Sequence, residues 1–256
     1  MRILAKVRLR LKVSFRALLQ FEDSFSRSPF KLSFSQSGED IIVWFLLQHL
    51  KIQHPTYVDI GAHHPEYLSN TALFYLLGSR GINIEPDPRL FAKFTKSRSE
   101  DINLNIGIAA SSGSMIFYRM TDPALSTLSA AEASRMSSEE GISISERFEV
   151  PVDTIRNVLQ RHQCCPDFLS IDVEGKDLEI LESYDFATHR PAVICIETIS
   201  FSLHGNGVKN SAIPVLLARH GYRMYADTYI NTIFVDDARF SSSSESGQNA
   251  TSECTS

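Results

Sequence analysis

A short apolar run that ends in a glycine turn, residues 57–62, constrains the fold of this chain more than any other stretch. Residues 57–60 predict a buried strand, and the spacing of residues 67–77 predicts a helix after the turn. Strand, glycine turn and helix together form the ligand-binding unit of open α/β sheets. We expect Gly61 to let the backbone approach a ligand, whose ammonium or hydroxyl groups would donate to Asp59.

A second strand strengthens this interpretation. The first turn alone fits a structural role equally well, because the later glycines of the dinucleotide fingerprint are replaced at His64, Pro65 and beyond. Residues 81–84 predict another strand, which ends in Glu85. A carboxylate about 20 residues after such a turn commonly binds the ribose of the ligand. We therefore expect Glu85 to hold a ribose, and a surface acid at a strand end is the alternative.

Three further acids follow predicted strands. The strand over 168–171 delivers Asp172 and Glu174, and the strand over 192–196 delivers Glu197. Carboxyl ends of neighbouring parallel strands share one edge, where ligands bind. Acids that are crowded at this edge repel one another unless a cation or hydrogen-bond donors bind to them. Their arrangement therefore predicts a ligand-binding site. One hypothesis is that Asp172, Glu174 and Glu197 hold a magnesium ion. The alternative is that the acids cap the next helix, which explains Glu174 better than Asp172.

Composition limits the class of protein. With 256 residues, 43% of them hydrophobic, the chain can bury the core of one domain. The formal charge of -5 argues against nucleic-acid binding, which needs a basic face. The four cysteines lack the spacing of a zinc site or a disulfide framework, so we expect reduced thiols and a cytoplasmic protein.

The chain divides into three predicted parts. Residues 1–34 form a basic N-terminal helical segment, either packed on the domain or lying on an anionic membrane or a partner; no apolar run in it is long enough to span a bilayer. Residues 35–240 form the main domain, in which the insertion 121–146 resembles a lid that selects the substrate. Residues 241–256 are a serine-rich tail, predicted to be disordered.

The remaining elements complete an α/β pattern. Gln36 and Glu39 precede a helix over 41–50, and we expect both to face the ligand as well. Further helices are predicted over 88–97, 153–163 with Asp153 as its cap, 176–184 and 212–220, and further strands over 102–109, 114–120 and 148–152. The last two strands, 221–225 and 231–235, predict a hairpin that adds an antiparallel strand to a parallel sheet.

Four ordered motifs agree with one known family. They are Gln36-x-Gly38-Glu39-Asp40, Asp59-Ile60-Gly61-Ala62 with Ser69-Asn70-Thr71, Gly81-Ile82-x-Ile84-Glu85-Pro86, and Asp167-Phe168-Leu169-x-Ile171-Asp172-Val173-Glu174-Gly175. Over about residues 35–236 the chain thus resembles the FkbM family of S-adenosylmethionine-dependent methyltransferases. The resemblance implies a Rossmann-like class I methyltransferase fold, α/β, with a mostly parallel seven-stranded sheet and a C-terminal antiparallel hairpin. It also implies methyl transfer to a hydroxyl of a small molecule or saccharide.

The resemblance implies roles for the matched residues. The methionine part of the cofactor would contact three residues of the first turn, namely Asp59, Gly61 and Ala62. Glu85 would hold the ribose, and Asp172 would lie beside the reacting methyl group. The turn departs from methyltransferases at large, because residues 63–65 replace a glycine that is common there.

Such a reaction needs a base that takes the hydroxyl proton while the acceptor is aligned with the methyl group. Asp172 and His204 are the candidates, although His204 also fits an ordinary loop histidine. Two other classes stay open. A nicotinamide-dependent oxidoreductase shares the turn and the ribose acid but lacks the later glycines, and a non-catalytic Rossmann-like binding protein would keep the fold alone.

Overall fold

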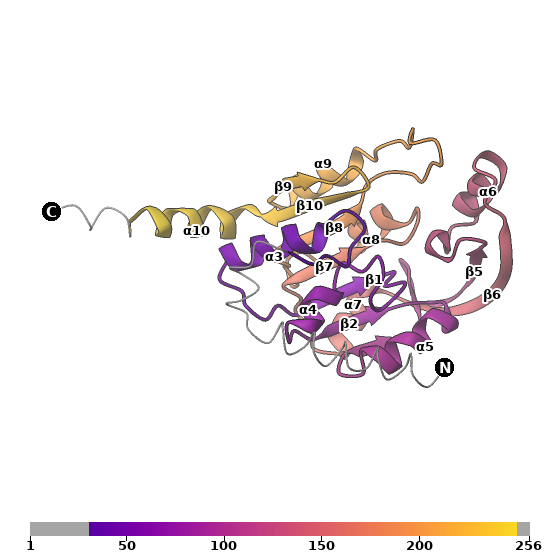
Figure 1. Cartoon of the computed structure of the whole chain (residues 1–256), viewed down its shortest axis with the longest axis horizontal. Coiled ribbons are helices and arrows are strands. Elements are labelled where there is room, and N and C mark those ends of the chain that lie inside the picture. Colours follow the sequence, from indigo (N-terminus) through magenta and orange to yellow (C-terminus); the bar gives the residue numbers. More distant parts are fainter. Residues whose placement is uncertain (1–30, 250–256) are drawn as a thin grey trace.

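A seven-stranded sheet runs through the centre of the molecule (Figure 1). The computed structural model describes residues 31–249, with side chains described as far as residue 243. The strands lie in the order β3-β2-β1-β7-β8-β10-β9. Their bounds are β1 Tyr57–Ile60, β2 Gly81–Ile84, β3 Ile102–Leu104, β7 Phe168–Ile171, β8 Val193–Glu197, β9 Tyr222–Asp227 and β10 Asn231–Asp236. The first five in this order are parallel and β10 is antiparallel to both neighbours, so the predicted Rossmann-like α/β fold with its C-terminal hairpin is confirmed.

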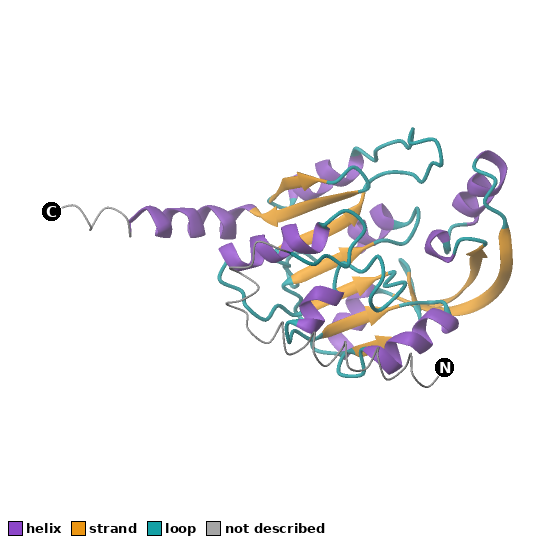
Figure 2. Cartoon of the chain, viewed as in Figure 1, coloured by secondary structure: helices purple, strands orange, loops and turns teal. Residues whose placement is uncertain are grey.

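Helices cover both faces of this sheet (Figure 2). The helices are α3 Glu39–His49 and α4 Ala72–Leu76 on one face, and α7 Ile155–Arg161, α8 Asp177–Ser183 and α9 Ala212–Arg219 on the other. Successive strand residues point to opposite faces, so Tyr57 packs in the α3 and α4 layer while Val58 packs in the α7 layer. Each fully buried apolar side chain in these layers stabilises the fold by about 1.5–3 kcal/mol.

A second, smaller sheet stands beyond the carboxyl ends of β1 and β7 (Figure 1). It contains β4 Gly107–Ile108, β5 Gly113–Met120 and β6 Ile144–Asp153, in the order β4-β6-β5. The short helix η1 Pro123–Leu125 and helix α6 Ala130–Glu139 connect β5 to β6. We call β5, η1, α6 and β6 together the arm. The arm places side chains opposite the edge of the main sheet where the sequence predicts ligand binding.

The helix predicted over 67–77 is shorter than expected. Only Ala72–Leu76 is helical, and a loop over 61–71 separates α4 from β1. Leu68 in this loop has a φ of 53°, which no right-handed helix allows, and the Ser69 hydroxyl accepts a hydrogen bond from the first backbone N–H of α4. The glycine turn therefore does not lead directly into a helix N-terminus.

The strand predicted over 102–109 is broken into β3 and β4. Asn105 lies between the two pieces, and its side-chain amide donates to the backbone carbonyls of Glu85 at 2.8 Å and Pro86 at 2.9 Å. This contact turns the chain away from β2 and into the second sheet. A sequence pattern cannot show it, because the two partners are remote in sequence.

The arm is more regular than the lid predicted over 121–146. Strand β6 already begins at Ile144, and helix α6 is capped by the Ser129 hydroxyl, which accepts from a backbone N–H three residues on. Asp153, predicted as the cap of α7, instead ends β6. Thr154 caps α7, because its hydroxyl accepts from the backbone N–H of residue 157 at 3.1 Å.

The tail predicted as disordered over 241–256 is helical as far as Asn249. Helix α10 Asp237–Asn249 continues from β10, and the buried Asp236 carboxylate accepts from the backbone N–H groups of residues 238 and 239. The ring of Phe240 lies 4.9 Å from that of His49. These contacts start the helix against the domain, which a serine-rich composition does not reveal. Residues 250–256 lie outside the described residues.

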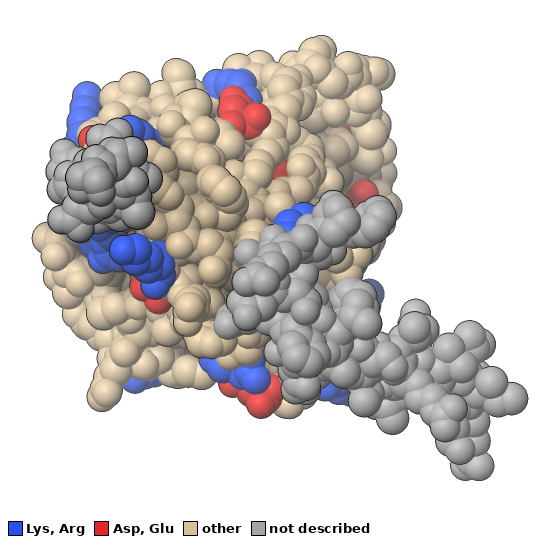
Figure 3. Space-filling view, turned by 60° about the vertical axis from the view of Figure 1, so that its left-hand side comes forward, with Lys and Arg blue, Asp and Glu red and all other residues tan. Residues whose placement is uncertain are grey.

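The basic N-terminal helix and its membrane contact, predicted for residues 1–34, lie outside the described residues apart from 31–34, which are not helical. Within residues 31–249 no helix is long and apolar enough to cross a bilayer. Basic side chains are scattered on the face shown in Figure 3, several of them beside acidic ones. Cys164, Cys165 and Cys195 are free thiols.

Replacement of Gly61 by alanine should destabilise the fold strongly. A Cβ at Gly61 would lie 1.7 Å from the backbone oxygen of Asp172, and the φ of Gly61 is +78°. We expect Gly61→Ala to lower the free energy of unfolding by at least about 3 kcal/mol. Gly141 is the matched control, because its φ is +71° and an added Cβ would meet nothing within 4 Å. Gly141→Ala should lose only about 1 kcal/mol in urea denaturation, and equal losses would refute the steric argument.

Candidate active site

A cavity of about 430 Å³ opens between the carboxyl edge of the main sheet and the arm. The sheet contributes the acids predicted from the sequence, which are Asp59, Glu85, Asp172, Glu174 and Glu197. The arm contributes Phe117 and residues 122–128, and the loop after β8 contributes residues 199–202. The volume lies in the range of about 300–1,000 Å³ that is typical of small-molecule sites.

Asp59 lies on β1 and is only 4% exposed. The Thr71 hydroxyl donates to its carboxylate at 2.6 Å, and the Arg98 guanidinium donates to the Thr71 oxygen at 2.9 Å. Arg98, 1% exposed, also pairs with Asp101 at 2.9 Å. Burial raises the pKa of Asp59, although the Thr71 hydrogen bond opposes this. A buried network of fixed donors thus orients the carboxylate that lines the cavity.

Glu85 follows β2 and joins the two turns at the sheet edge. Its carboxylate accepts from the backbone N–H of His63 at 2.8 Å and from that of Asp87 at 2.7 Å. Burial raises the pKa of Glu85 to about 8. A carboxylate has about four lone-pair sites, so two remain for ligand hydroxyls. Glu85 thereby fixes the shape of the first turn and still presents acceptors to the cavity.

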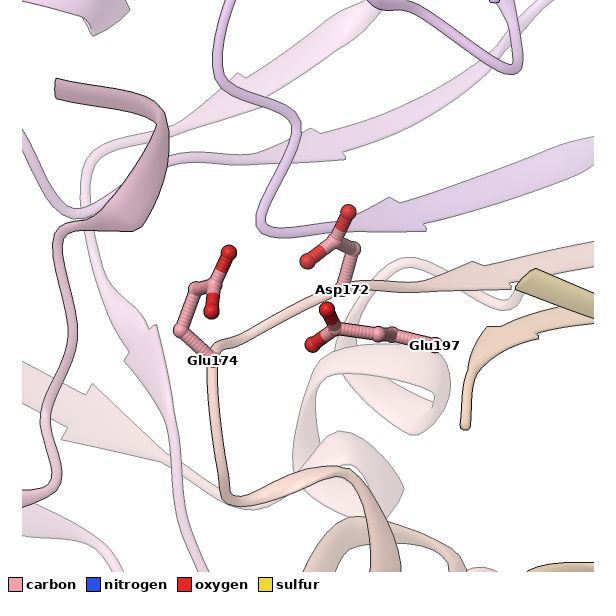
Figure 4. Close-up of side chains that lie close together, drawn as sticks. All are labelled: Asp172, Glu174 and Glu197. Atoms are coloured by element: carbon pink, nitrogen blue, oxygen red, sulfur yellow. The ribbon is translucent and has the colours of Figure 1, made fainter. Parts of the chain in front are cut away.

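Three acids meet at the ends of β7 and β8. Side-chain oxygens of Asp172, Glu174 and Glu197 all lie within 4.8 Å of one another, around one shared space (Figure 4). Burial raises the pKa of each carboxyl, and repulsion from neighbouring acids raises it further. The arrangement matches the sequence prediction of a polar cleft formed by acids from successive strands.

The arm fixes the backbone at Glu174. This residue has a φ of 54°, a left-handed conformation that is costly for a side chain larger than glycine. The Thr127 hydroxyl of the arm donates to the Glu174 carbonyl oxygen at 2.7 Å, and the next residue, Gly175, also has a positive φ of 93°. Backbone strain of this kind concentrates at functional sites. The arm therefore shapes the acid cluster as well as covering it.

The structure brings most of the predicted site residues together. Residues that line the cavity include Gln36, Asp59, Gly61, Ala62, Glu85 and Asp172. Glu39 does not line it, because this buried carboxylate accepts from Thr228 at 2.7 Å and Asn231 at 3.2 Å and so holds α3 to the hairpin. His204 is exposed in the loop after β8 and is also absent from the lining. Of the two candidate bases, only Asp172 reaches the cavity.

Sequence reasoning missed several lining residues. The apolar ones are Leu90, Ile106 and Phe117, and the polar or aromatic ones are Tyr67, Asn70, Tyr229 and Asn231. Asn70 could have been found, because it stands in the Ser69-Asn70-Thr71 motif; its amide donates to Ser170 on β7 at 3.2 Å. The apolar residues carry no chemical signal in the sequence, since any core residue looks the same.

The family assignment agrees with this geometry. The sequence profile of the Methyltransferase FkbM domain matches residues 59–224, more than half of the chain. The chain belongs to this family, as its motifs predicted, and is thereby identified as a methyltransferase. No protein with a curated description matches the chain.

Two solved structures are similar in fold. One is precorrin-6y C5,15-methyltransferase from Geobacter metallireducens GS-15, with 14% identity, a TM-score of 0.39, and coverage of 83% of this chain and 94% of that one. The other is 1,6-didemethyltoxoflavin-N1-methyltransferase from Burkholderia thailandensis, solved with 1,6-didemethyltoxoflavin and S-adenosylhomocysteine. Its identity is 10%, its TM-score is 0.39, and the match covers 90% of this chain and 88% of that one.

Removal of the buried Thr71 hydroxyl should lower the free energy of unfolding more than removal of an exposed threonine hydroxyl. Thr71→Val leaves Asp59 and Arg98 without their buried partner, so we expect a loss of about 1–3 kcal/mol in urea denaturation. Thr71→Ser keeps the hydroxyl and should recover most of the loss. Thr188, exposed and donating to Asp185 at 2.9 Å, is the control, and Thr188→Val should change stability by less than about 0.5 kcal/mol. Similar losses at both positions would show that the network does not hold Asp59.

Proposed function

We propose that this methyltransferase uses S-adenosylmethionine and methylates a hydroxyl group of a small molecule or saccharide. The observation that carries the proposal is the convergence of Asp59, Glu85 and Asp172 on one cavity, from the ends of three adjacent parallel strands. Such a sheet edge binds nucleotide-like ligands, and its acids fit the ammonium and ribose hydroxyls of this cofactor.

The cofactor would lie along this edge. Asp59 and the Gly61-Ala62 turn would receive the methionine part, and Glu85 would accept from the ribose hydroxyls. The apolar side chains of Leu90 and Ile106 also line the cavity, and Ile106 follows β3, the strand beyond β2 in the sheet; these side chains suit the adenine ring. This order leaves the sulfur end near Asp172, where β7 ends.

The protein's own chemical task is alignment and proton transfer. Bound S-adenosylmethionine would supply an electrophilic methyl group. Asp172 would hold the acceptor hydroxyl in line with that group and take its proton as the new C–O bond forms. His204 is exposed and does not line the cavity, so we assign the proton transfer to Asp172 alone. The arm excludes water from the reacting atoms, because its residues form the opposite wall.

Aromatic side chains at the cavity support a small acceptor. Tyr67 and Tyr229 line the cavity yet remain 62% and 52% exposed, so they stand at its mouth. Rings of this kind pack against the flat faces of sugars and aromatic molecules. A saccharide or other small hydroxylated molecule is the acceptor that this mouth suits. Magnesium, also predicted from the sequence, stays a prediction for Asp172, Glu174 and Glu197.

Calorimetric titration with S-adenosylmethionine and S-adenosylhomocysteine tests the cofactor. We expect micromolar dissociation constants for both and at least tenfold weaker binding in Asp59→Asn, which keeps the side-chain shape but loses the charge. NADH should not bind, and tight NADH binding would favour the nicotinamide-dependent oxidoreductase. Asp167→Asn, at the opposite end of β7, is the matched control. Folded protein that binds neither methyl compound would favour the non-catalytic binding protein.

The affinity for the cofactor should depend on pH through Glu85. Its raised pKa of about 8 means that this carboxyl is largely protonated at neutral pH in the free protein. Acceptance of two ribose hydroxyl bonds requires the ionised form, so the affinity should rise as the pH increases from 6.5 to 8.5. Glu85→Gln should bind more weakly and without this dependence. A flat wild-type profile, with binding intact, would contradict the role of Glu85.

A further inference from the structure

The acid cluster of Asp172, Glu174 and Glu197 differs from every other buried acid described around it. Asp59 is held by Thr71, and Asp177 accepts from the backbone N–H groups of residues 173 and 175. By contrast, no hydrogen bond or salt bridge from residues 31–243 reaches the three side chains of the cluster. Glu174 and Glu197 are each only 8% exposed. Buried carboxyl groups in proteins normally accept hydrogen bonds, pair with a basic group or bind a metal ion, so Glu174, Glu197 and the half-buried Asp172, which have no such partner, form a candidate cation site.

Two basic side chains in the region of the cluster, Arg135 and Lys209, are bonded to other residues. Arg135 on α6 donates to Glu132 at 2.6 Å, and Lys209 donates to Asp227 at 2.7 Å and to the Thr198 hydroxyl at 3.0 Å. All three carboxyl groups surround one space that opens into the cavity (Figure 4). The charge of Arg135 acts on Glu174 from a distance and opposes the rise in its pKa that burial causes, but among residues 31–243 no basic side chain is bonded to the three carboxyl groups.

We propose that Asp172, Glu174 and Glu197 bind a divalent cation with hard-ligand character, such as magnesium. Oxygen atoms on opposite sides of an ion lie about 4.2 Å apart around magnesium and about 4.8 Å apart around calcium. One oxygen from each residue lies within 4.8 Å of the other two, which is within reach of calcium and, after a small closing movement, of magnesium. One oxygen from each residue fills three positions of an octahedral ion and leaves three open.

A cation at this site would restrict the methyl acceptor to one chemical class. This step rests on the proposed function. The cation would bind the reacting hydroxyl at one open position and a second oxygen of the acceptor at another. Two oxygens on adjacent carbons, as in a vicinal diol, satisfy both positions. The cation lowers the pKa of the bound hydroxyl, and the second oxygen of Asp172 can still accept its proton. The oxygen then bonds to the methyl carbon while the S–C electron pair stays on sulfur, so atoms and charges balance.

Manganese titration, followed by electron paramagnetic resonance of the free ion, tests the site without turnover. We expect one Mn²⁺ bound per chain, displaced by Mg²⁺, and at least tenfold weaker binding in both Glu174→Gln and Glu197→Gln. Glu182→Gln is the control, because this residue is exposed on α8 away from the cluster, and its binding should match wild type. Thermal unfolding should show a metal-induced rise in Tm in wild type and control only. The glutamine variants should fold, since they remove repulsion between buried acids.

Cofactor titration in EDTA separates this proposal from the preceding one. Binding of S-adenosylmethionine by a protein that shows no manganese site below millimolar concentration would overturn the cation site and leave the proposed function standing. Cation binding that both glutamine variants retain would overturn the ligand assignment. An ammonium-bearing compound, tested as methylammonium, should not compete with Mn²⁺; competition would show that the cluster recognises an amine instead. Failure to bind the cofactor, with the manganese site present, would refute the proposed function alone.

Discussion

The site depends on how closely two backbones approach just beyond the ends of β1 and β7. Asp172 donates its backbone N–H to Ile60 at 3.0 Å, and its carbonyl oxygen occupies the position that a Cβ on Gly61 would take. This contact needs both the missing side chain and the positive φ of glycine. It brings Asp59 and Asp172 to the same cavity. The sequence predicted that Gly61 lets a ligand approach the backbone. In the structure, Gly61 is needed at least as much for the close packing of the chain beyond β1 and β7.

The buried acids fall into two groups, those that accept hydrogen bonds from the protein and those that do not. Glu39, Asp40 and Asp177 accept from nearby backbone or side-chain donors, and these contacts hold helices and turns in place. The acids that face the cavity at β7 and β8 meet no such donor within the part of the chain that the structure describes. The desolvation of a carboxylate is costly unless a partner offsets it. Asp59 and Glu85 also line the cavity but are held by internal donors, so the three acids at the ends of β7 and β8 are the ones left for a ligand.

The arm shows how a local sequence signal can miss the role of a segment. Residues 121–146 lack a strong apolar period, so the sequence indicated a lid without showing α6. In the structure, Thr127 holds the strained backbone of Glu174, and Arg135 donates to the carbonyl of Phe201 in the loop after β8 at 2.9 Å. Both contacts join segments more than 40 residues apart. No spacing rule can foresee them, because only the tertiary fold brings the partners together.

The sequence by itself determined the strands and the acids at their ends. Short, largely apolar runs such as those before Asp172 and Glu197 are typical of buried central strands, and neighbouring parallel strands end at one edge. The family motifs indicated the class of protein, because they lie at the ends of these strands. Only the tertiary structure decided which acids are free. Glu39 looked as suitable as Asp59, yet Thr228 and Asn231 occupy it, and His204 lies outside the cavity. The physical reason is that a side chain's availability depends on partners from distant strands and loops, which sequence spacing does not specify.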